Sequence, residues 1–443
     1  MNAILNFLFS KTPLYFITQS LWRDEAFSYL LAKKDMIEIF ALTAKDFNPP
    51  LYYLILHLWI KIFGPSEISL RSLSLIFYWA TIYIFYLFLI NVLKIKSRRF
   101  AFLYLIFAIT NPLLVYYGFE ARMYSLFAFL ATLSFYALKI NNQKLHLIST
   151  ILGLFTHYFM IFVILAQVFY LFIFKEKKAN HFLNHLKKNY LISFLFFFPW
   201  LFFVFIQKNG FIFQSFWIKK INLTNFISFL ALIYTDYEKG FNYFNNFIFK
   251  LGIFFNFLVI LLFLKNLKAK KEEKKLFYFF LFWGILLPFL IILISFMRPI
   301  FLPRYLIFST IGFLLFLILC LEKIPNNLKI LFLTILITFN FIYNFSQVSY
   351  RKKFDIKKVI REIKILAKEN DLLYVTSELN FHETQYYFDE RRVFIYNKTY
   401  EEIPNYVGKV LIPKEKLIYQ LPIYPTKAFI LFPNGRYEIQ AMF

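Results

Sequence analysis

Long apolar runs with few charges constrain the fold of this 443-residue chain more than any other feature. A helix needs about 20 apolar residues to cross a bilayer core of roughly 30 Å, and several runs approach that length. Hydrophobic residues make up 60% of the sequence, too many for a water-soluble protein of this size. The sequence therefore predicts an α-helical polytopic membrane protein. About eleven apolar segments are expected, at 2–20, 68–92, 100–116, 122–139, 145–156, 158–174, 190–206, 245–264, 276–296, 304–321 and 328–346.

Basic links between these segments predict the orientation of the chain. The net charge of +25 is concentrated in lysine-rich links, a pattern typical of membrane orientation signals rather than of nucleic-acid binding. If all of the links are cytoplasmic, the spans alternate with the N-terminus inside and the C-terminus outside, in a multi-pass protein of the cell (inner or plasma) membrane. This scheme requires residues 145–174 to form a hairpin of two short spans that turns near His157. The links are 94–99, 139–144, 175–188, 265–275 and 323–329.

The same topology divides the chain into a transmembrane catalytic domain, 1–349, and an extracytoplasmic α/β domain, 350–443. Within the first outer loop, 21–67, the segment 51–63 is apolar but too short to cross, so we expect an interfacial or re-entrant helix. A second outer region covers 207–244. In the tail, changes in apolar period predict two helices and five strands. The helices are expected at 355–369 and 380–388, and the strands at 371–376, 392–396, 409–412, 427–432 and 436–442.

Ionisable residues gather on the predicted outer face, although the lysine links alone set the topology. Taken one at a time, each has a purely structural interpretation, as a solvated loop acid, an interface anchor or a Glu–Arg pair. Tyr52 and Tyr53 follow a proline pair, which is typical of the start of a helix. Together they form a functional hypothesis, because carboxylates facing arginines suit a phosphorylated, membrane-embedded substrate. We also expect Glu120 and Tyr124 to share a helix face. The other candidates are Asp24, Glu25, Arg71, Arg122, His157, Arg298, Arg304 and Tyr305.

At these residues the sequence resembles the GT-C glycosyltransferases. The resemblance is to family 39-like enzymes, which include protein O-mannosyltransferases, the lipid A aminoarabinose transferase and related bacterial sugar transferases. Five segments, in the same order as in the family, carry the resemblance. The sequence departs from the family at two places. Asn48 replaces the His or Lys that relatives often have before the proline pair, and the tail segment KKFDIKKVIREI resembles a family segment but lacks its Trp-Arg. The segments are WRDEAFSY, NPPLYYLILHLWIKIFGPSEISLRSLS, YYGFEARMYSL, THYF and PRYLIF.

The resemblance implies a polyprenyl-phosphate sugar donor and sugar transfer to a lipid, glycan or protein acceptor at the outer face. Asp24 matches the general-base position, with inversion at the anomeric carbon, and Glu25 is the second catalytic candidate. Arg71, Arg122 and Arg304 are candidates to bind the phosphate. Glu25 and Glu120 could orient the sugar or the base. If a divalent metal is present, the oxygen ligands Asp24, Glu25 and Glu120 favour Mg²⁺ or Mn²⁺.

Two other functions are compatible with parts of the pattern. A transporter or flippase for a lipid-linked sugar predicts ionisable groups spread through the span interiors and internal repeats, whereas the sequence shows these groups at one face and no repeat. A non-catalytic membrane scaffold that presents the 350–443 domain predicts that Asp24→Asn is silent. Asp236 and Glu238, in TDYEKG, look like a metal-binding D-x-E pair, which we interpret as a chance match in a loop.

Overall fold

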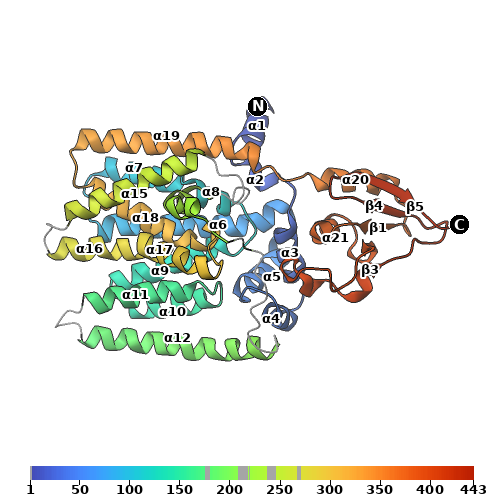
Figure 1. The fold of residues 1–443 in the computed structure, drawn as a ribbon, viewed down its shortest axis with the longest axis horizontal. Helices are drawn as coiled ribbons and strands as arrows, with labels where there is room; N and C mark the ends of the chain where they lie inside the picture. The colour runs from blue at the N-terminus through green and yellow to red at the C-terminus, as the bar shows by residue number, and fades with distance from the viewer. Residues whose placement is uncertain (1, 175–179, 208–217, 219, 237–245, 267–270) are drawn as a thin grey trace. The chain divides into compact units, whose positions relative to one another are not determined.

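A computed structural model gives the fold for all residues except 1, 175–179, 208–217, 219, 237–245 and 267–270 (Figure 1). The basic residues at 175–178 and 267–270, Glu238, and much of 207–244 lie outside the described residues. The chain divides into two compact units. The loop–tail unit comprises Met1–Leu73, Glu120–Arg122 and Val348–Phe443, and the helical unit comprises Ser74–Phe119 and Met123–Gln347.

The helical unit is built from apolar helices, and α6, which begins in the loop–tail unit, continues into it. Two of its long helices contain a π-helical turn, η1 (Phe88–Val92) and η4 (Phe282–Leu286). The remaining helices are α6 (Glu67–Leu87), α7 (Arg98–Ile109), α8 (Pro112–Gly118), α9 (Tyr124–Lys139), α10 (Gln143–Leu154), α11 (Met160–Ile173), α12 (Asn180–Gln207), α13 (Leu223–Ile227), α14 (Phe229–Thr235), α15 (Asn246–Asn266), α16 (Lys271–Leu281), α17 (Leu287–Met297), η5 (Pro303–Leu306), α18 (Ile307–Leu321) and α19 (Asn326–Tyr350).

The helical polytopic membrane fold predicted from the sequence is confirmed. Among the described residues, five helices are long and apolar enough to cross a bilayer, and a bent pair, Arg98–Ile109 with Pro112–Gly118, would make a sixth. Three further predicted segments contain shorter apolar helices, Tyr124–Lys139, Met160–Ile173 and Phe247–Leu261. The five long helices are Glu67–Val92, Leu186–Gln207, Glu273–Met297, Pro303–Leu321 and Asn326–Tyr350.

Two predicted segments are interrupted by proline. The expected continuous segment 2–20 is wrong, since the chain forms α1 (Asn2–Lys11) and α2 (Tyr15–Thr18) on either side of Pro13. The expected segment 100–116 bends by 61° where α7 gives way to Pro112 at the start of α8. Proline has no amide hydrogen and disfavours helical geometry in the residue before it, so it begins a helix more readily than it continues one.

Buried amides on α19 compensate for the break between α7 and α8. The Asn344 side chain donates to the carbonyl of Thr110 at 2.7 Å, and Asn340 donates to the carbonyl of Phe107 at 3.2 Å. In an apolar environment a backbone carbonyl released from its helix needs such a partner. The predicted short hairpin is also present: α10 ends at Leu154, α11 begins at Met160, and His157 lies in the turn between them.

The loop–tail unit combines the first predicted outer loop with the C-terminal tail. The predicted interfacial segment 51–63 is a helix with the same bounds, α5 (Leu51–Phe63). The five-stranded sheet has the order β3-β2-β1-β4-β5, and only β5 is antiparallel to its neighbour. The other elements are α3 (Arg23–Ala32), α4 (Met36–Lys45), α20 (Ile356–Leu366), α21 (Phe381–Tyr387), β1 (Leu372–Val375), β2 (Val393–Tyr396), β3 (Leu417–Ile418), β4 (Ala428–Leu431) and β5 (Tyr437–Gln440), with 3-10 turns at Glu378–Asn380, Glu390–Arg392, Asn405–Val407, Lys409–Leu411 and Lys414–Lys416.

The tail has its own apolar core, as its size predicts. Ile360 and Ile363 of α20 pack with Phe381 of α21 against Leu373 and Val375 of β1. The strand expected at 409–412 is wrong: residues 409–411 form a 3-10 turn, because Gly408 adopts a left-handed conformation with φ +81°.

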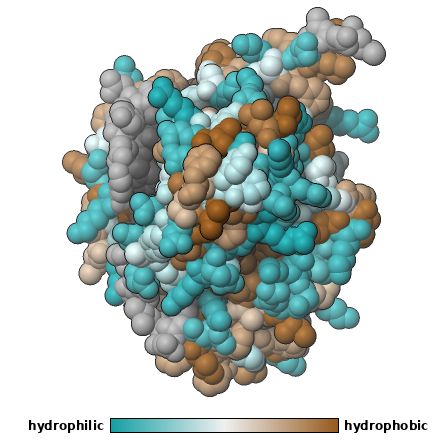
Figure 2. All heavy atoms as spheres, turned by 90° about the vertical axis from the view of Figure 1, so that its right-hand side faces the viewer, coloured by the Kyte–Doolittle hydropathy of each residue, from teal (hydrophilic) through white to brown (hydrophobic). Residues whose placement is uncertain are grey.

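The face of the molecule shown in Figure 2 carries many hydrophilic side chains with hydrophobic ones between them.

Candidate functional site

Glu25 and Arg71 form a fully buried ion pair in the loop–tail unit. The Arg71 guanidinium donates to both Glu25 oxygens, at 2.8 and 2.7 Å, in the two-pronged geometry that makes Arg–carboxylate pairs strong. Its remaining N–H groups donate to the carbonyls of Ile17, Gln19 and Ser20. All five N–H donors of Arg71 are therefore engaged within the chain, so its role in this structure is to hold Glu25 and the segment before α3.

Glu25 also links the two acidic motifs that the sequence places nearly a hundred residues apart. The backbone amide of Ala121 donates to Glu25 Oε1 at 3.0 Å, so the turn that carries Glu120 and Arg122 lies against the start of α3. Burial alone would raise the pKa of Glu25, but the charges of Arg71 and Lys353 outweigh burial and hold that pKa well below its usual range. Glu25 is therefore an ionised anchor.

Asp24 precedes Glu25 in the first turn of α3 but has a different environment. Its carboxylate pairs with Arg23 Nε at 3.0 Å, and its side chain keeps 13% of its surface exposed, whereas Glu25 keeps none. Arg122 donates to the Asp24 carbonyl at 3.2 Å and to the Ser28 hydroxyl at 3.3 Å. Asp24 is thus a partly exposed carboxylate at a helix N-terminus, with Arg23 and Arg122 beside it.

Glu120 lies in a turn, and the predicted helix face shared with Tyr124 is wrong. Helix α8 ends at Gly118 and α9 begins at Tyr124, and in between the Arg122 amide bonds to the Glu120 carbonyl at 2.7 Å. Glu120 is buried and lies within the electrostatic reach of Lys353. The turn therefore presents Glu120 and Arg122 beside α3 instead of along a helix.

Lys353 and Glu383, two residues that the sequence analysis did not select, also belong to this cluster. Lys353 Nζ lies 3.2 Å from Glu25 Oε2 and 4.9 Å from the centre of the Trp22 ring. Glu383 accepts a hydrogen bond from the Arg23 amide, and burial, opposed by that bond and by nearby cations, raises its pKa to about 8. The stretch KKFDIKKVIREI, which resembles a family segment apart from the missing Trp-Arg, was the one sequence signal near Lys353, and nothing in the sequence indicates what Glu383 contacts.

The aromatic candidates of α5 line the same region. Tyr52 and Tyr53 are both fully buried, and the Tyr53 ring meets the Phe27 ring of α3 edge-on at 6.2 Å. Tyr53 is also close enough to Arg122 and Asp24 to interact with their charges. Tyr53 therefore packs against α3, with the Tyr52 ring beside it.

A second cluster brings four predicted residues together within the helical unit. The Arg304 guanidinium lies 5.7 Å from the ring centre of Tyr124 and 5.6 Å from that of Tyr305. His157 lies 5.1 Å from the Tyr305 ring, and its Nδ1 accepts from the Phe159 amide at 3.1 Å. Arg304 and His157 are nearly completely buried. Arg298, by contrast, is exposed at the end of α17.

Asp236, interpreted from the sequence as a chance match, is buried in the helical unit. It ends α14 in a left-handed conformation with φ +56°, and its carboxylate accepts from the Tyr117 hydroxyl at 2.8 Å. The Tyr117 ring in turn meets the Tyr124 ring at 5.0 Å. Its companion in the supposed D-x-E pair, Glu238, lies outside the described residues.

The three carboxylates named as possible metal ligands do not fit that role in this arrangement. Both Glu25 oxygens accept hydrogen bonds from Arg71, and one also faces Lys353. Within the described part of the chain, no group of three or more His, Cys, Asp or Glu side chains is arranged to hold a metal ion. Glu25 and Asp24 are instead engaged in ion pairs, with Arg71 and Lys353 and with Arg23 respectively.

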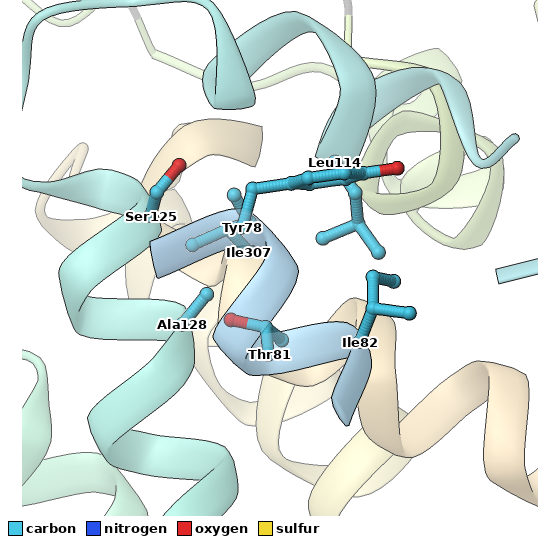
Figure 3. A pocket seen from close by; sticks show the side chains of 7 residues that line it. All are labelled: Tyr78, Thr81, Ile82, Leu114, Ser125, Ala128 and Ile307. Atoms are coloured by element: carbon cyan, nitrogen blue, oxygen red, sulfur yellow. The ribbon is translucent and has the colours of Figure 1, made fainter. Parts of the chain in front are cut away.

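The helical unit contains a cavity that is too small to hold a sugar substrate. Its volume is about 10 Å³, room for roughly one water molecule. Figure 3 shows Tyr78 and Ser125 among the side chains around it; the others are Thr81, Ile82, Leu114, Ala128 and Ile307.

Comparison with known proteins supports the predicted fold. No family model and no curated protein matches the sequence. Among solved structures, ArnT from Cupriavidus metallidurans in the apo state matches with a TM-score of 0.61 and 11% identity, over 97% of this chain and 91% of that one. ArnT bound to undecaprenyl phosphate matches with a TM-score of 0.64 and 12% identity, over 97% of this chain and 93% of that one. ArnT is the lipid A aminoarabinose transferase of the resemblance above, so the chain has the fold that the resemblance implied.

Proposed function

We propose that this protein is a membrane glycosyltransferase that moves a sugar from a polyprenyl-phosphate donor to a lipid, glycan or protein acceptor, with Asp24 as the general base. One observation carries the proposal: the WRDE and FEAR segments meet, since the Ala121 amide donates to the Glu25 carboxylate and Arg122 donates to the Asp24 carbonyl. The fold shared with ArnT, one structure of which holds undecaprenyl phosphate, supports a lipid-phosphate donor.

Asp24 suits the general base better than its neighbour Glu25. A base must reach the acceptor and accept its proton, and Asp24 keeps part of its surface exposed, while Glu25 is enclosed by Arg71, Lys353 and the Ala121 amide. As Asp24 takes the proton, the acceptor atom attacks the anomeric carbon and the polyprenyl phosphate leaves from the opposite side, which inverts that centre. General-base assistance contributes roughly 10²–10⁴-fold to such steps.

A leaving phosphate requires cations rather than a strong acid, and the contacts of the arginine candidates support different roles for them. Because Arg71 has all of its donors engaged within the chain, we assign it to holding Glu25. Arg304 stands among Tyr124, Tyr305 and His157, and we propose it as a contact of the donor phosphate. Arg122 is the corresponding candidate beside Asp24.

The decisive experiment supplies the purified full-length chain, in lipid nanodiscs, with undecaprenyl-phosphate-linked sugars and candidate acceptors. Asp24→Asn should reduce transfer by about 10²-fold or more without changing membrane insertion or thermal stability. Glu38→Gln is the matched control, since Glu38 is a partly exposed acid in the same loop, paired with Lys34. Full turnover by Asp24→Asn would remove Asp24 as the base, and movement of the lipid-linked sugar across the bilayer without transfer would favour a flippase.

The predicted orientation belongs to the proposal, because a donor used at the outer face requires Asp24 to lie there. A reporter fused after Phe443 should be extracytoplasmic, and one inserted at Lys271 should be cytoplasmic. The reverse result would place the cluster at the inner face.

A further inference from the structure

We propose that the tail is part of the catalytic centre, and that Lys353 and Glu383 are positioning residues that hold the first turn of α3, and with it Asp24, in place. The proposal rests on the function proposed above. It concerns contacts within the loop–tail unit alone.

Three consecutive residues before Asp24, residues 19–21, each form a hydrogen bond with the tail. The Lys353 amide donates to the Gln19 side chain at 3.4 Å, the Ser20 hydroxyl donates to Asp355 at 2.5 Å, and the Leu21 amide donates to the Tyr387 hydroxyl at 2.8 Å. Each of residues 19–21 therefore has a polar partner between residues 353 and 387. These bonds fix where the chain enters α3.

Lys353 and Glu383 continue this series on both sides of Asp24. The Lys353 ammonium covers the Trp22 ring and pairs with Glu25. Glu383 accepts a hydrogen bond from the Arg23 amide. Arg23 is the first helical residue of α3, so its amide has no partner within the helix. Residues 22, 23 and 25 are thus all held by the tail, while the Asp24 carboxylate keeps its partial exposure.

This arrangement matters for catalysis because the rate of such a reaction depends steeply on geometry. A misplacement of about 1 Å can cost roughly 10²-fold in rate. Glu25 remains bound to Arg71 when Lys353 is removed, so the loop need not unfold, but the start of α3 loses a buried ionic contact. The expected defect is therefore in the chemical step rather than in donor binding.

Other contacts attach the tail to the loop at a distance from Asp24, and they provide the control. Lys357 pairs with Glu67 at 2.5 Å, and Glu67 also accepts from the Tyr387 hydroxyl. Removing Lys357 leaves the bond between the Leu21 amide and the Tyr387 hydroxyl in place. Breaking this pair tests whether attachment of the tail in general, rather than the contacts at α3, is what the centre requires.

The experiment measures kcat and the donor KM for Lys353→Met, Lys353→Arg, Glu383→Leu and Lys357→Met in nanodiscs, with undecaprenyl-phosphate-linked sugar as the probe. Lys353→Met and Glu383→Leu should lower kcat by roughly 10- to 100-fold with little change in donor KM. Lys353→Arg should recover most of the kcat, and Lys357→Met should remain close to the wild type. Thermal melting of each variant identifies any that fail to fold.

Three results would overturn the proposal. They are unchanged kcat in folded Lys353→Met and Glu383→Leu, equal loss in Lys357→Met, or a loss confined to donor KM. Each leaves the transferase assignment intact, because the wild type still transfers sugar and Asp24→Asn still fails. If the wild type transfers no sugar from any donor offered, the proposed function fails, and the positioning role fails with it.

Discussion

The buried pair between Glu25 and Arg71 gives the sharpest prediction for stability. Arg71→Met removes the guanidinium and leaves the Glu25 carboxylate, which is fully buried, with Lys353 as its remaining cation. Removing one partner of a buried pair typically costs about 3–5 kcal/mol. The carbonyls of Ile17, Gln19 and Ser20 also lose their donor, at roughly 1 kcal/mol or more for each group that finds no new partner.

The expected total for Arg71→Met, about 5 kcal/mol after allowing for Lys353, is comparable to the whole stability of many domains. Arg71→Lys should be intermediate, because one ammonium cannot reproduce five donors in a plane. The double variant Glu25→Met with Arg71→Met should be less destabilised than the sum of the single variants, since it leaves no unpaired acid at this position.

The assay is thermal melting in nanodiscs combined with hydrogen exchange of residues 17–25. Arg298→Met is the control, because Arg298 is exposed. Exchange in residues 17–25 should accelerate sharply in Arg71→Met and only slightly in the control. Additive effects of the two single substitutions, or a melting temperature equal to that of the control, would show that the pair does not hold the loop.

Three further predictions test other contacts. Gly408→Ala should lower the melting temperature more than Gly64→Ala. Both glycines have positive φ, but only at Gly408 would the new Cβ clash, at 2.4 Å from Phe27. Equal effects would contradict the packing described. Arg304→Ala should weaken donor binding more than acceptor binding, with Arg304→Lys in between; equal losses for donor and acceptor in binding assays would argue against a phosphate contact. The pKa of Glu383 is raised to about 8 in the folded protein, so folded Glu383 keeps a proton that the unfolded chain releases near the ordinary pKa of a glutamate. The free energy of unfolding should therefore fall as pH rises towards 8. Glu383→Gln should flatten this dependence in melting curves from pH 5 to 9, and an unchanged slope would refute it.

Local sequence patterns predicted local structure well. The apolar run at 51–63 gave a helix with the same bounds, the turn at His157 was correctly placed, and four of the five expected tail strands formed at or near their predicted positions. The errors also have local causes: Pro13 divides the first segment, and Gly408 turns the chain where a strand was expected. The period of apolar residues indicates helix or strand, but individual prolines and glycines decide where each element ends.

Contacts between distant parts of the chain were only partly predictable. The two acidic segments were expected to meet because the topology put both on one face, but the bond that joins them, from the Ala121 amide to Glu25, involves a backbone group that no residue pattern reveals. Lys353 was one lysine among many, and Glu383 lay on a short helix with no charge pattern around it. Their importance depends on how the tail folds against α3, which sequence spacing does not encode.

The neighbouring acids Asp24 and Glu25 show why the structure was needed to separate the roles of the site residues. Successive residues on a helix point about 100° apart, so two adjacent carboxylates can have very different surroundings. In this chain one side of α3 meets Arg71, Lys353 and the Ala121 amide and takes Glu25 out of contact with solvent, while Asp24 stays partly exposed beside Arg23. If Glu25 were the base instead, acceptor binding would have to break a buried ion pair, at a cost of several kcal/mol. These contacts therefore support the proposal that Glu25 is an anchor and Asp24 the base.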